Sequence, residues 1–477
     1  MKRRHHVIEA LVLAVFCCLV ATQIFIAPVV SLANNGDFGV MIGRFGLGPM
    51  NDGPEGTLVY APTAYVFHGA RYFVAVNLSS ELLLIVPAVF IGWTISPLLF
   101  DIRIMGAVHA IVLVAGFALL LPLSRRLPVW RRLILLSLLT VVLSDVHYVS
   151  HLNSFYTDVA ALLGLLFMVG AGLHLALRER EDNFWLVAFC AAACFLIASK
   201  PPHALLAVCL FPLALAAALR RPRNWAGYLA AASLLAVGAG TWALAPPVER
   251  ARNLYTATFI RIPQVAHDPP AALREMGLGD EYVPHLGHWA YQEGAPNDEW
   301  FLAFAQTQSY GRLALWYLRH PQWAYQILAS DLHGPAAHIR MPILSNYRKE
   351  DGFPPGAQAH SHQFWSSFRS RMIRLYPWHL PVWFSIYLSA FGAVMWFRRG
   401  TPDARFAVVA FAVGVMALVE FAIPSLADGA ETDRHLFLFH ALTDASILLA
   451  LTAAIAAAPF KSSRGTAPAA AARSQPC

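Results

Sequence analysis

Charged residues are scarce in this chain, which has 477 residues and only 13% Asp, Glu, Lys and Arg. A soluble domain carries about 25% charged residues, so the composition excludes an ordinary soluble globular protein. Hydrophobic residues make up 57% of the chain. Apolar runs of roughly 17–25 residues, the length that crosses a bilayer, recur along it. The sequence therefore predicts an all-α polytopic membrane protein.

Cysteine and metal-binding motifs are equally sparse. Five of the six cysteines lie in predicted membrane segments and the sixth is the last residue, so they are expected to be small apolar core residues. No cysteine pair has the spacing of a zinc site with histidine nearby. Lys and Arg are scattered and do not gather on one soluble face, which argues against a nucleic-acid partner. The net charge of +7 is therefore best interpreted through membrane topology.

The N-terminus combines basic residues 2–4 with an apolar run and a cleavage-like Ser-Leu-Ala at 31–33. A signal peptide has an apolar core of about 7–15 residues, and this run is longer. The segment is predicted to be an uncleaved membrane anchor.

Arginine-rich turns decide the topology. If every candidate span crosses and the N-terminus is inside, the turns near 125–132, 178–180 and 220–223 all face outside, against the positive-inside rule. They become cytoplasmic if 80–99 is an outer interfacial or re-entrant helix, which requires protein to cover its backbone groups. We therefore predict ten crossings with both termini inside; eleven crossings are the alternative. The candidate spans are 8–30, 80–99, 104–123, 132–149, 158–177, 183–199, 203–219, 224–245, 379–397, 404–424 and 436–458.

This topology collects the unusual polar segments on the outer face, while the inner turns are short and basic. It divides the chain into an N-terminal transmembrane module (1–245, with a first outer loop at 31–103), an extracytoplasmic loop (246–378), C-terminal membrane helices (379–459) and a disordered cytoplasmic tail (460–477). The aromatic stretch 299–332 of the long loop is expected to lie along the membrane surface. The loop is expected to be too short for an independent domain with a large core.

Asp37 follows the first predicted span, in the sequence Asn-Asn-Gly-Asp-Phe at 34–38. Asn, Gly and Asp commonly end helices and form turns, so a polar helix exit is one interpretation. The other is a general base, because a partly buried carboxylate can accept the proton of an attacking hydroxyl. Asp52 and Glu55 are weaker candidates in the same loop, and Arg44 is expected to pair with Asp37 or contact a phosphate.

Three further polar segments contain candidate binding residues. Each has a structural alternative: helix capping near 153–158, a lysine that reaches the headgroups at 200, and acids that suit the helix dipole at 428–435. Asp444 is an ionisable group deep in the last span, where such a group usually faces a cavity or a partner. The binding interpretation assigns sugar hydroxyls to Asn153, Tyr156 and Asp158, a phosphate to Lys200, and a pyrophosphate or sugar to Arg434 and His435, with Arg261 and Arg340 of the long loop as further cations.

Five stretches in order resemble the GT-C superfamily of integral-membrane glycosyltransferases. They resemble more closely a bacterial family of hexosyltransferases that act in cell-surface and S-layer glycan biosynthesis. The matching stretches are 34–38 (Asn-Asn-Gly-Asp-Phe), 153–156 (Asn-Ser-Phe-Tyr), 199–201 (Ser-Lys-Pro), 273–282 (Leu-Arg-Glu-Met-Gly-Leu-Gly-Asp-Glu-Tyr) and 433–439 (Asp-Arg-His-Leu-Phe-Leu-Phe).

The resemblance implies a GT-C-like bundle that moves a hexose, with inversion, from a polyprenyl-phosphate-linked donor to a lipid-linked or surface glycan acceptor. It places the site on the extracytoplasmic face of a bacterial inner membrane, among membrane lipids. It makes Asp37 the base and Asn35 a neighbouring substrate contact. Asp158 departs from the family, where a Glu is expected. The sequence identifies no cofactor with certainty, and a divalent cation held by Asp37 with Glu431 or Asp433 is left open. The alternatives are a lipid-linked oligosaccharide ligase or polymerase, or a glycolipid flippase.

Overall fold

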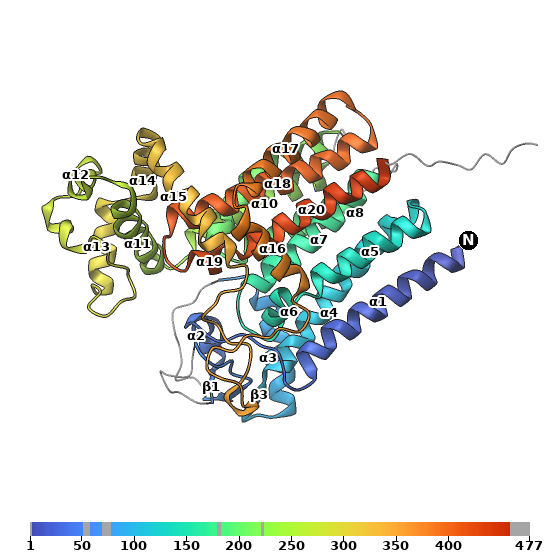
Figure 1. The fold of residues 1–477 in the computed structure, drawn as a ribbon, viewed down its shortest axis with the longest axis horizontal. Coiled ribbons are helices and arrows are strands. Elements are labelled where there is room, and N and C mark those ends of the chain that lie inside the picture. Colours follow the sequence, from blue (N-terminus) through green and yellow to red (C-terminus); the bar gives the residue numbers. More distant parts are fainter. Residues whose placement is uncertain (1, 51–57, 69–77, 179–182, 221–223, 458–477) are drawn as a thin grey trace, which may run out of the picture.

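The computed structural model describes residues 2–50, 58–68, 78–178, 183–220 and 224–457. Long helices run in a common oblique direction and form a bundle, and a group of shorter helices projects from one end of it as a separate lobe (Figure 1). Asp52, Glu55 and the tail 460–477 lie outside the described residues.

The bundle helices are apolar and long. In the described part of the chain, eight helices are long and apolar enough to cross a membrane, and a ninth span is counted if α5 and α6, which meet at 54°, act together. Two shorter apolar helices, α3 and α8, accompany them. The prediction of an all-α, multi-pass membrane protein is confirmed. The bundle helices are α1 (Lys2–Phe25), α3 (Leu82–Ile95), α4 (Ile102–Leu120), α5 (Val129–Leu143), α6 (Val146–Leu152), α7 (Asp158–Leu177), α8 (Asn183–Ile197), α9 (Leu206–Leu219), α10 (Trp225–Ala243), α17 (His379–Phe397), α18 (Pro402–Ala427) and α20 (Phe437–Ala457).

Helix α7 is the centre of the bundle, since 89% of its apolar span is buried. Its glycines allow close approach of neighbouring helices, as is common between membrane helices. A Cβ on Gly164 would stand 2.8 Å from the backbone nitrogen of Leu196 on α8. A Cβ on Gly170 would meet the side chain of Leu119 at 2.7 Å. The small residues of α7 thus fix where α4 and α8 pack, and so where the residues at its N-terminus lie.

The arginine-rich turns share one end of the bundle. Glu9 of α1 lies 2.5 Å from both Arg125 and Arg132. Arg126 donates to the carbonyl of Leu177 at the end of α7, at 2.9 Å. The N-terminal end of α1 and the C-terminal end of α20 also lie there (Figure 1). This grouping is the one that the ten-crossing topology requires, and the opposite end of the bundle is called the loop end below.

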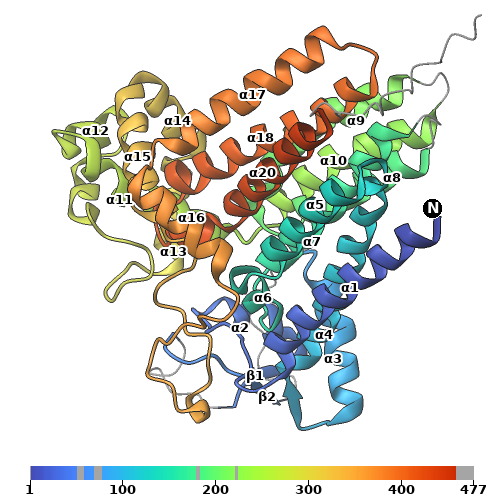
Figure 2. The same ribbon diagram turned by 45° about the vertical axis from the view of Figure 1, so that its right-hand side comes forward.

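Helix α3 begins and ends at the loop end. Ser79 and Ser80, just before it, donate to the carbonyls of Ser199 and Phe195 at the end of α8, at 2.7 and 2.6 Å. Near its other end, Gly92 faces the ring of Phe100, just before α4 begins. Figure 2 shows α3 beside the lower part of α4, next to the small sheet. This placement agrees with the prediction that 80–99 does not cross the membrane.

Cysteine labelling tests this placement of α3. We expect a cysteine at Leu98, which is 70% exposed, to react with a membrane-impermeant thiol reagent added outside intact cells. The measurement uses a variant that lacks the native cysteines and carries a second cysteine at Arg126 as the cytoplasmic control. Reaction of position 98 only after the cells are opened would contradict the non-crossing placement.

A small sheet lies at the loop end and is formed by the first outer loop. Strands β1 (Leu47–Pro49), β2 (Ala64–Phe67) and β3 (Leu99–Asp101) pair antiparallel in the order β1-β2-β3. Tyr65 of β2 and Phe100 of β3 pack on Phe155, with ring centroids 5.1 and 5.8 Å away. The first outer loop is therefore anchored on the turn between α6 and α7.

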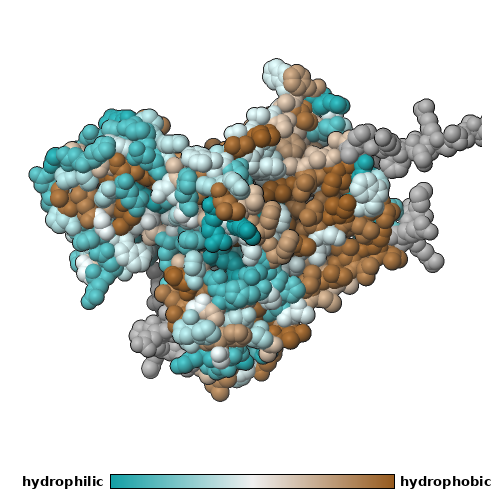
Figure 3. All heavy atoms as spheres, in the orientation of Figure 1, coloured by the Kyte–Doolittle hydropathy of each residue, from teal (hydrophilic) through white to brown (hydrophobic). Residues whose placement is uncertain are grey.

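The long loop folds into a lobe with its own core. Phe301, Phe304 and Trp316 are at most 2% exposed and pack with Tyr255 and Phe259, so the expected membrane-surface location of 299–332 is wrong for these aromatics. Aromatic side chains bury large areas, so even a short segment can form a core. Figure 3 shows hydrophilic residues over much of the lobe and hydrophobic residues over the helices of the bundle. The lobe helices are α11 (Pro247–Val265), α12 (Pro269–Glu275), α13 (Asp298–Thr307), α14 (Tyr310–Arg319) and α15 (Pro321–His333), followed by α16 (Phe364–Leu375).

Candidate active site

Asp37 opens α2 (Asp37–Ile42) on an Asn-Gly turn. The Asn34 side chain accepts from the backbone N–H groups of Gly36 and Phe38, at 2.8 and 3.1 Å. Gly36 has a φ of 113°, a conformation that residues with a Cβ rarely adopt. Helix α1 already ends at Phe25, so the helix-exit interpretation is wrong: the segment 34–38 starts a helix.

Arg434 forms the ion pair of Asp37. It comes from α19 (Thr432–His435), which lies between α18 and α20, and its Nη1 contacts an Asp37 carboxylate oxygen. The Asp37 side chain remains 47% exposed. Burial acts to raise the pKa of Asp37, but the positive charges of Arg434 and Lys200 outweigh it, so this pKa lies below its usual value. Asp37 is thus an ionised, accessible carboxylate whose basicity is restrained by one arginine.

Asn35 and Tyr156 hold the Asp37 turn against α7. The Tyr156 hydroxyl donates to the Ala33 carbonyl at 2.9 Å and accepts from the Asn35 backbone N–H at 3.1 Å. The Asn35 amide donates to Glu431 at 2.9 Å, and Glu431 lies 3.0 Å from Nε of Arg434. Burial raises the pKa of Tyr156 above its ordinary value, so the hydroxyl is a neutral donor.

Glu431 occupies an uncommon backbone conformation. Its φ of 45° and ψ of 39° lie in the left-handed region, which costs a non-glycine residue of the order of 1–3 kcal/mol and is found often at functional sites. The hydrogen bond that Glu431 accepts from Asn35 and its ion pair with Arg434 stabilise this conformation. Glu431 thus completes a four-residue network with Asn35, Asp37 and Arg434 from opposite parts of the chain.

Lys200 is paired with Asp158. Its ammonium lies 2.7 Å from both carboxylate oxygens of Asp158, which is the first residue of α7 and is buried. The Lys200 side chain is only 19% exposed. The structure therefore brings both predicted residues to the site but commits each to the other, which leaves neither with the free charge that the sequence interpretation assigned to it.

His435 is paired with Asp428. Its Nδ1 lies 2.6 Å from an Asp428 oxygen, and its Nε2 lies 2.9 Å from Nη2 of Arg434. Burial acts to raise the pKa of Asp428, but His435 outweighs it and the pKa falls below its usual value. The pair orients His435 beside Arg434, so the predicted grouping of these two residues is present.

Two predicted binding residues, Asn153 and Arg261, have structural partners. Asn153 is fully buried and donates to the carbonyls of Ile24 and Val30, at 3.0 and 2.8 Å, so it ties α1 to the turn after α6. Arg261 is buried and donates to both oxygens of Asp331, at 3.0 and 2.7 Å. Arg44 lies in a short turn at Gly43–Phe45, and Asp37 is paired with Arg434. The partners of Asn153 and Arg261 come from distant segments of the chain, which the local sequence does not reveal.

A polar cavity extends from Arg434 and Tyr156 into the loop end. It is narrow and partly open to solvent: the space available to the centre of a water-sized sphere is about 30 Å³. Sequence reasoning did not select several of its residues, because histidine and serine near a helix start are common and have no special spacing. The polar lining residues are His147, Ser150, His151, Tyr156, Asp158, Arg340, Asn346, Gln358, Asp433 and Arg434.

Metal binding was left open for Asp37 with Glu431 or Asp433. Within the described ranges, no three His, Cys, Asp or Glu side chains are grouped so that they could hold a metal ion. Asp37 and Glu431 are both turned to Arg434, which already supplies the local positive charge.

Comparison with known protein families gives one match over almost the whole chain. A family described as YfdI N-terminal transmembrane domain matches residues 1–472. No curated protein matches the chain. The family description agrees with the membrane bundle and does not specify a reaction.

Proposed function

The chain belongs to the YfdI N-terminal transmembrane domain family, and we propose that it is a glycosyltransferase. The proposed reaction moves a hexose, with inversion, from a polyprenyl-phosphate-linked donor to a cell-surface glycan acceptor. The proposed location is the outer face of a bacterial inner membrane, because the arginine-rich turns occupy the other end of the bundle and such turns stay in the cytoplasm. The ordered resemblance to GT-C glycosyltransferases supports the same reaction class.

The observation that carries this proposal is the half-exposed Asp37 paired with Arg434, whose side chain lines the cavity. In the proposed step, the Asp37 carboxylate takes the proton of an acceptor hydroxyl. The oxygen of that hydroxyl attacks the anomeric carbon of the donor. The bond between that carbon and the phosphate oxygen breaks, and polyprenyl phosphate leaves with the electron pair. A positioned carboxylate suits this role, since general base catalysis contributes about 10²–10⁴ in rate.

Arg434 gives the site a means to control that base. In the free protein it stabilises the ionised form of Asp37, which keeps the carboxylate a weak base. The same ion pair holds the Asp37 side chain in place beside the cavity residue Arg434, so the carboxylate is positioned before an acceptor hydroxyl arrives.

The direct test uses purified protein in lipid vesicles. A synthetic polyprenyl-phosphate hexose is supplied with a lipid-linked acceptor glycan, and both polyprenyl phosphate release and the anomeric configuration of the product are measured. Acceptor-dependent release with an inverted linkage is expected. Transfer of a whole oligosaccharide with no single-hexose product would favour the ligase or polymerase alternative.

The flippase alternative depended mainly on Asp444 in the last helix. Arg369 donates to one oxygen of Asp444 at 2.6 Å, and the Tyr148 hydroxyl donates to the other at 2.5 Å. Both charges are buried and matched, which is the arrangement of a structural ion pair. Asp444 therefore gives no particular support to a transport function.

The pH dependence of transfer tests the coupling of Asp37 to Arg434. Lowering the pH protonates Asp37, so kcat/KM should fall only below the usual pKa of aspartate, about 3.9. Arg434→Gln removes the charge that stabilises the carboxylate, so the fall of kcat/KM at acidic pH (the acidic limb of the pH profile) should move to higher pH. Lys349→Gln, an exposed cation of the long loop, is the control that should leave the limb in place. If the acidic limb of Arg434→Gln does not shift, Arg434 does not control the pKa of the base.

A further inference from the structure

His147 is a buried side chain with unmet hydrogen-bonding capacity. It is 3% exposed, lines the cavity, and neither of its ring nitrogens has a hydrogen-bond partner in the protein. Its ring is held by packing, with centroids of Tyr148 and Phe437 at 4.7 and 5.2 Å. Buried polar atoms almost always have a partner, so these nitrogens require a polar group from within the cavity.

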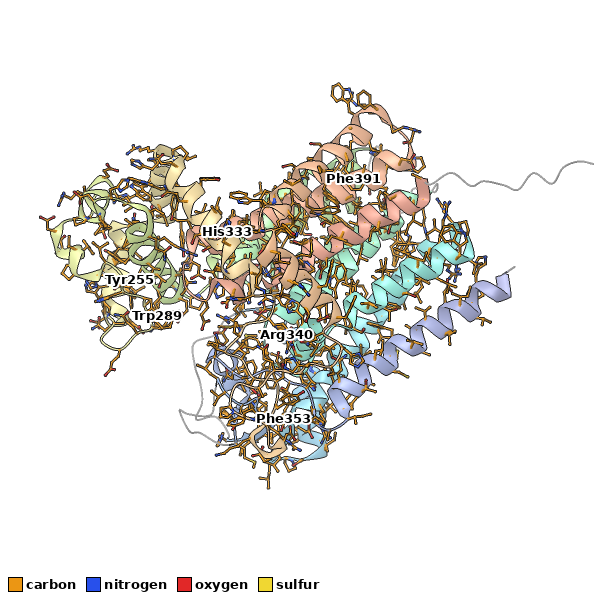
Figure 4. The ribbon with its side chains drawn as sticks, viewed as in Figure 1. Tyr255, Trp289, His333, Arg340, Phe353 and Phe391 are labelled. Atoms are coloured by element: carbon orange, nitrogen blue, oxygen red, sulfur yellow. The ribbon has the colours of Figure 1, made fainter. Side chains whose placement is uncertain are left out.

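Arg340 is the neighbouring cation; among the described residues its hydrogen bonds go to neutral groups, and the carboxylate of Asp145 acts on it from beyond ion-pair distance. Its guanidinium donates to the Ala359 carbonyl at 2.6 Å and the Gln363 side chain at 3.4 Å, and it also contacts Asn346. The other two cations of the site face carboxylates: Lys200 faces Asp158, and Arg434 faces Asp37. Figure 4 labels Arg340 near the centre of the molecule, where the chain returns from the lobe to the bundle.

The two ends of the cavity are separated by a row of side chains. The guanidinium of Arg434 lies 6.0 Å from the Tyr156 ring, Tyr156 lies 6.2 Å from His151, and His151 lies 5.9 Å from His147. Asp37 and Arg434 mark one end of this row. His147, which lines the cavity together with Ser150 and Arg340, marks the other, and the charge of Arg340 acts on it.

We propose that His147, Ser150 and Arg340 bind the phosphate of the lipid-linked donor. This inference rests on the proposed glycosyl transfer. Inversion requires the hydroxyl and the phosphate to stand on opposite sides of the anomeric carbon, so a base at one end of the cavity calls for a phosphate site at the other. A guanidinium with no carboxylate within ion-pair distance among the described residues, a hydroxyl and an imidazole N–H supply the charge and donors that a phosphate accepts.

Binding of farnesyl phosphate to the purified full-length protein in detergent, measured by calorimetry, tests the site. Arg340→Ala removes the cation and should weaken binding about tenfold or more, since hydrogen bonds to charged groups are the stronger ones. His147→Phe keeps the ring packing and removes the two nitrogens; it should weaken binding by a smaller factor while the melting temperature stays the same or rises. Arg374→Ala, at an exposed arginine of α16, is the matched control and should bind as the wild type does.

Wild-type affinity in both His147→Phe and Arg340→Ala would overturn the phosphate site, and the stable His147→Phe variant keeps the test valid if Arg340→Ala unfolds. Farnesyl phosphate should also raise the apparent KM of the donor; competition with the acceptor alone would overturn the donor assignment. Asp37→Asn separates the two proposals. It should bind farnesyl phosphate normally, so an active Asp37→Asn enzyme would remove the proposed base without affecting the phosphate site.

Discussion

Asp37→Asn is expected to lower kcat for hexose transfer by about 10²–10⁴, the usual contribution of a general base. Asparagine keeps the size of the side chain and loses the ability to take a proton. The fold should persist, because α2 is anchored by the buried Phe38 and Met41 while the Asp37 side chain is 47% exposed. Arg434 also retains Glu431 as a partner in the variant. The measurement is the rate of acceptor-dependent polyprenyl phosphate release, with the melting temperature as the check on folding.

Asp280→Asn provides the matched control for this variant. Asp280 is an aspartate of the lobe, 79% exposed and paired with Arg274, so its replacement should leave the transfer rate unchanged. Full activity in Asp37→Asn would remove Asp37 from the mechanism. Tolerance of Asp37→Asn together with loss of activity in Arg340→Ala would favour the ligase or polymerase alternative, which needs cations but no carboxylate base.

Arg261→Met is expected to destabilise the protein by about 3–5 kcal/mol, because it leaves the charge of Asp331 buried without its partner. Both side chains are at most 5% exposed. Arg261 also donates to the Thr432 hydroxyl at 2.8 Å, so the variant loses a tie between the lobe and α19, the helix that carries Arg434. The expected readouts are a lower melting temperature in detergent and a secondary loss of transfer.

The control for burial is Arg274→Met. Arg274 and Asp280 form a comparable ion pair at 2.8 Å, but they are 54% and 79% exposed, and exposed pairs contribute only about 0–1 kcal/mol. A double variant, Arg261→Met with Asp331→Leu, should recover much of the lost stability, because no charge remains buried. If Arg261→Met melts no lower than Arg274→Met, Arg261 does not hold the lobe to α19 and its role in binding would have to be reconsidered.

The membrane bundle could be predicted because its determinants are local. Spans such as 158–177 are visible as apolar runs, since the length and hydrophobicity of one segment suffice to place it in a bilayer. The clusters near 125–132 and 220–223 indicate direction for the same reason, because the charge rule acts on each short turn. The prediction that 80–99 does not cross the membrane followed from these charges alone, and the hydrogen bonds of Ser79 and Ser80 place the start of α3 beside the end of α8.

The aromatic stretch 299–332 shows where local reasoning failed. Its Trp and Tyr residues suit a membrane surface as well as they suit a core, and the sequence cannot distinguish the two. Packing against Tyr255 and Phe259 of α11 placed Phe304 and Trp316 inside the lobe. Burial of this kind depends on a partner helix that approaches only in the folded chain.

Asp37, Lys200, Asn153 and Arg261 were all recognisable in the sequence as polar residues at the outer end. Their roles were not, because a side chain's function depends on the partner that distant packing supplies. Asp37 pairs with Arg434, which is 397 positions away in the chain. Asn153 instead donates to backbone carbonyls, and Arg261 pairs with Asp331. The sequence by itself determined the class, the crossing helices and the end at which polar residues gather. The tertiary structure alone decided which charges form ion pairs and which, such as Arg340, have no ion-pair partner among the described residues, because electrostatic pairing acts over a few ångströms of space and not along the chain.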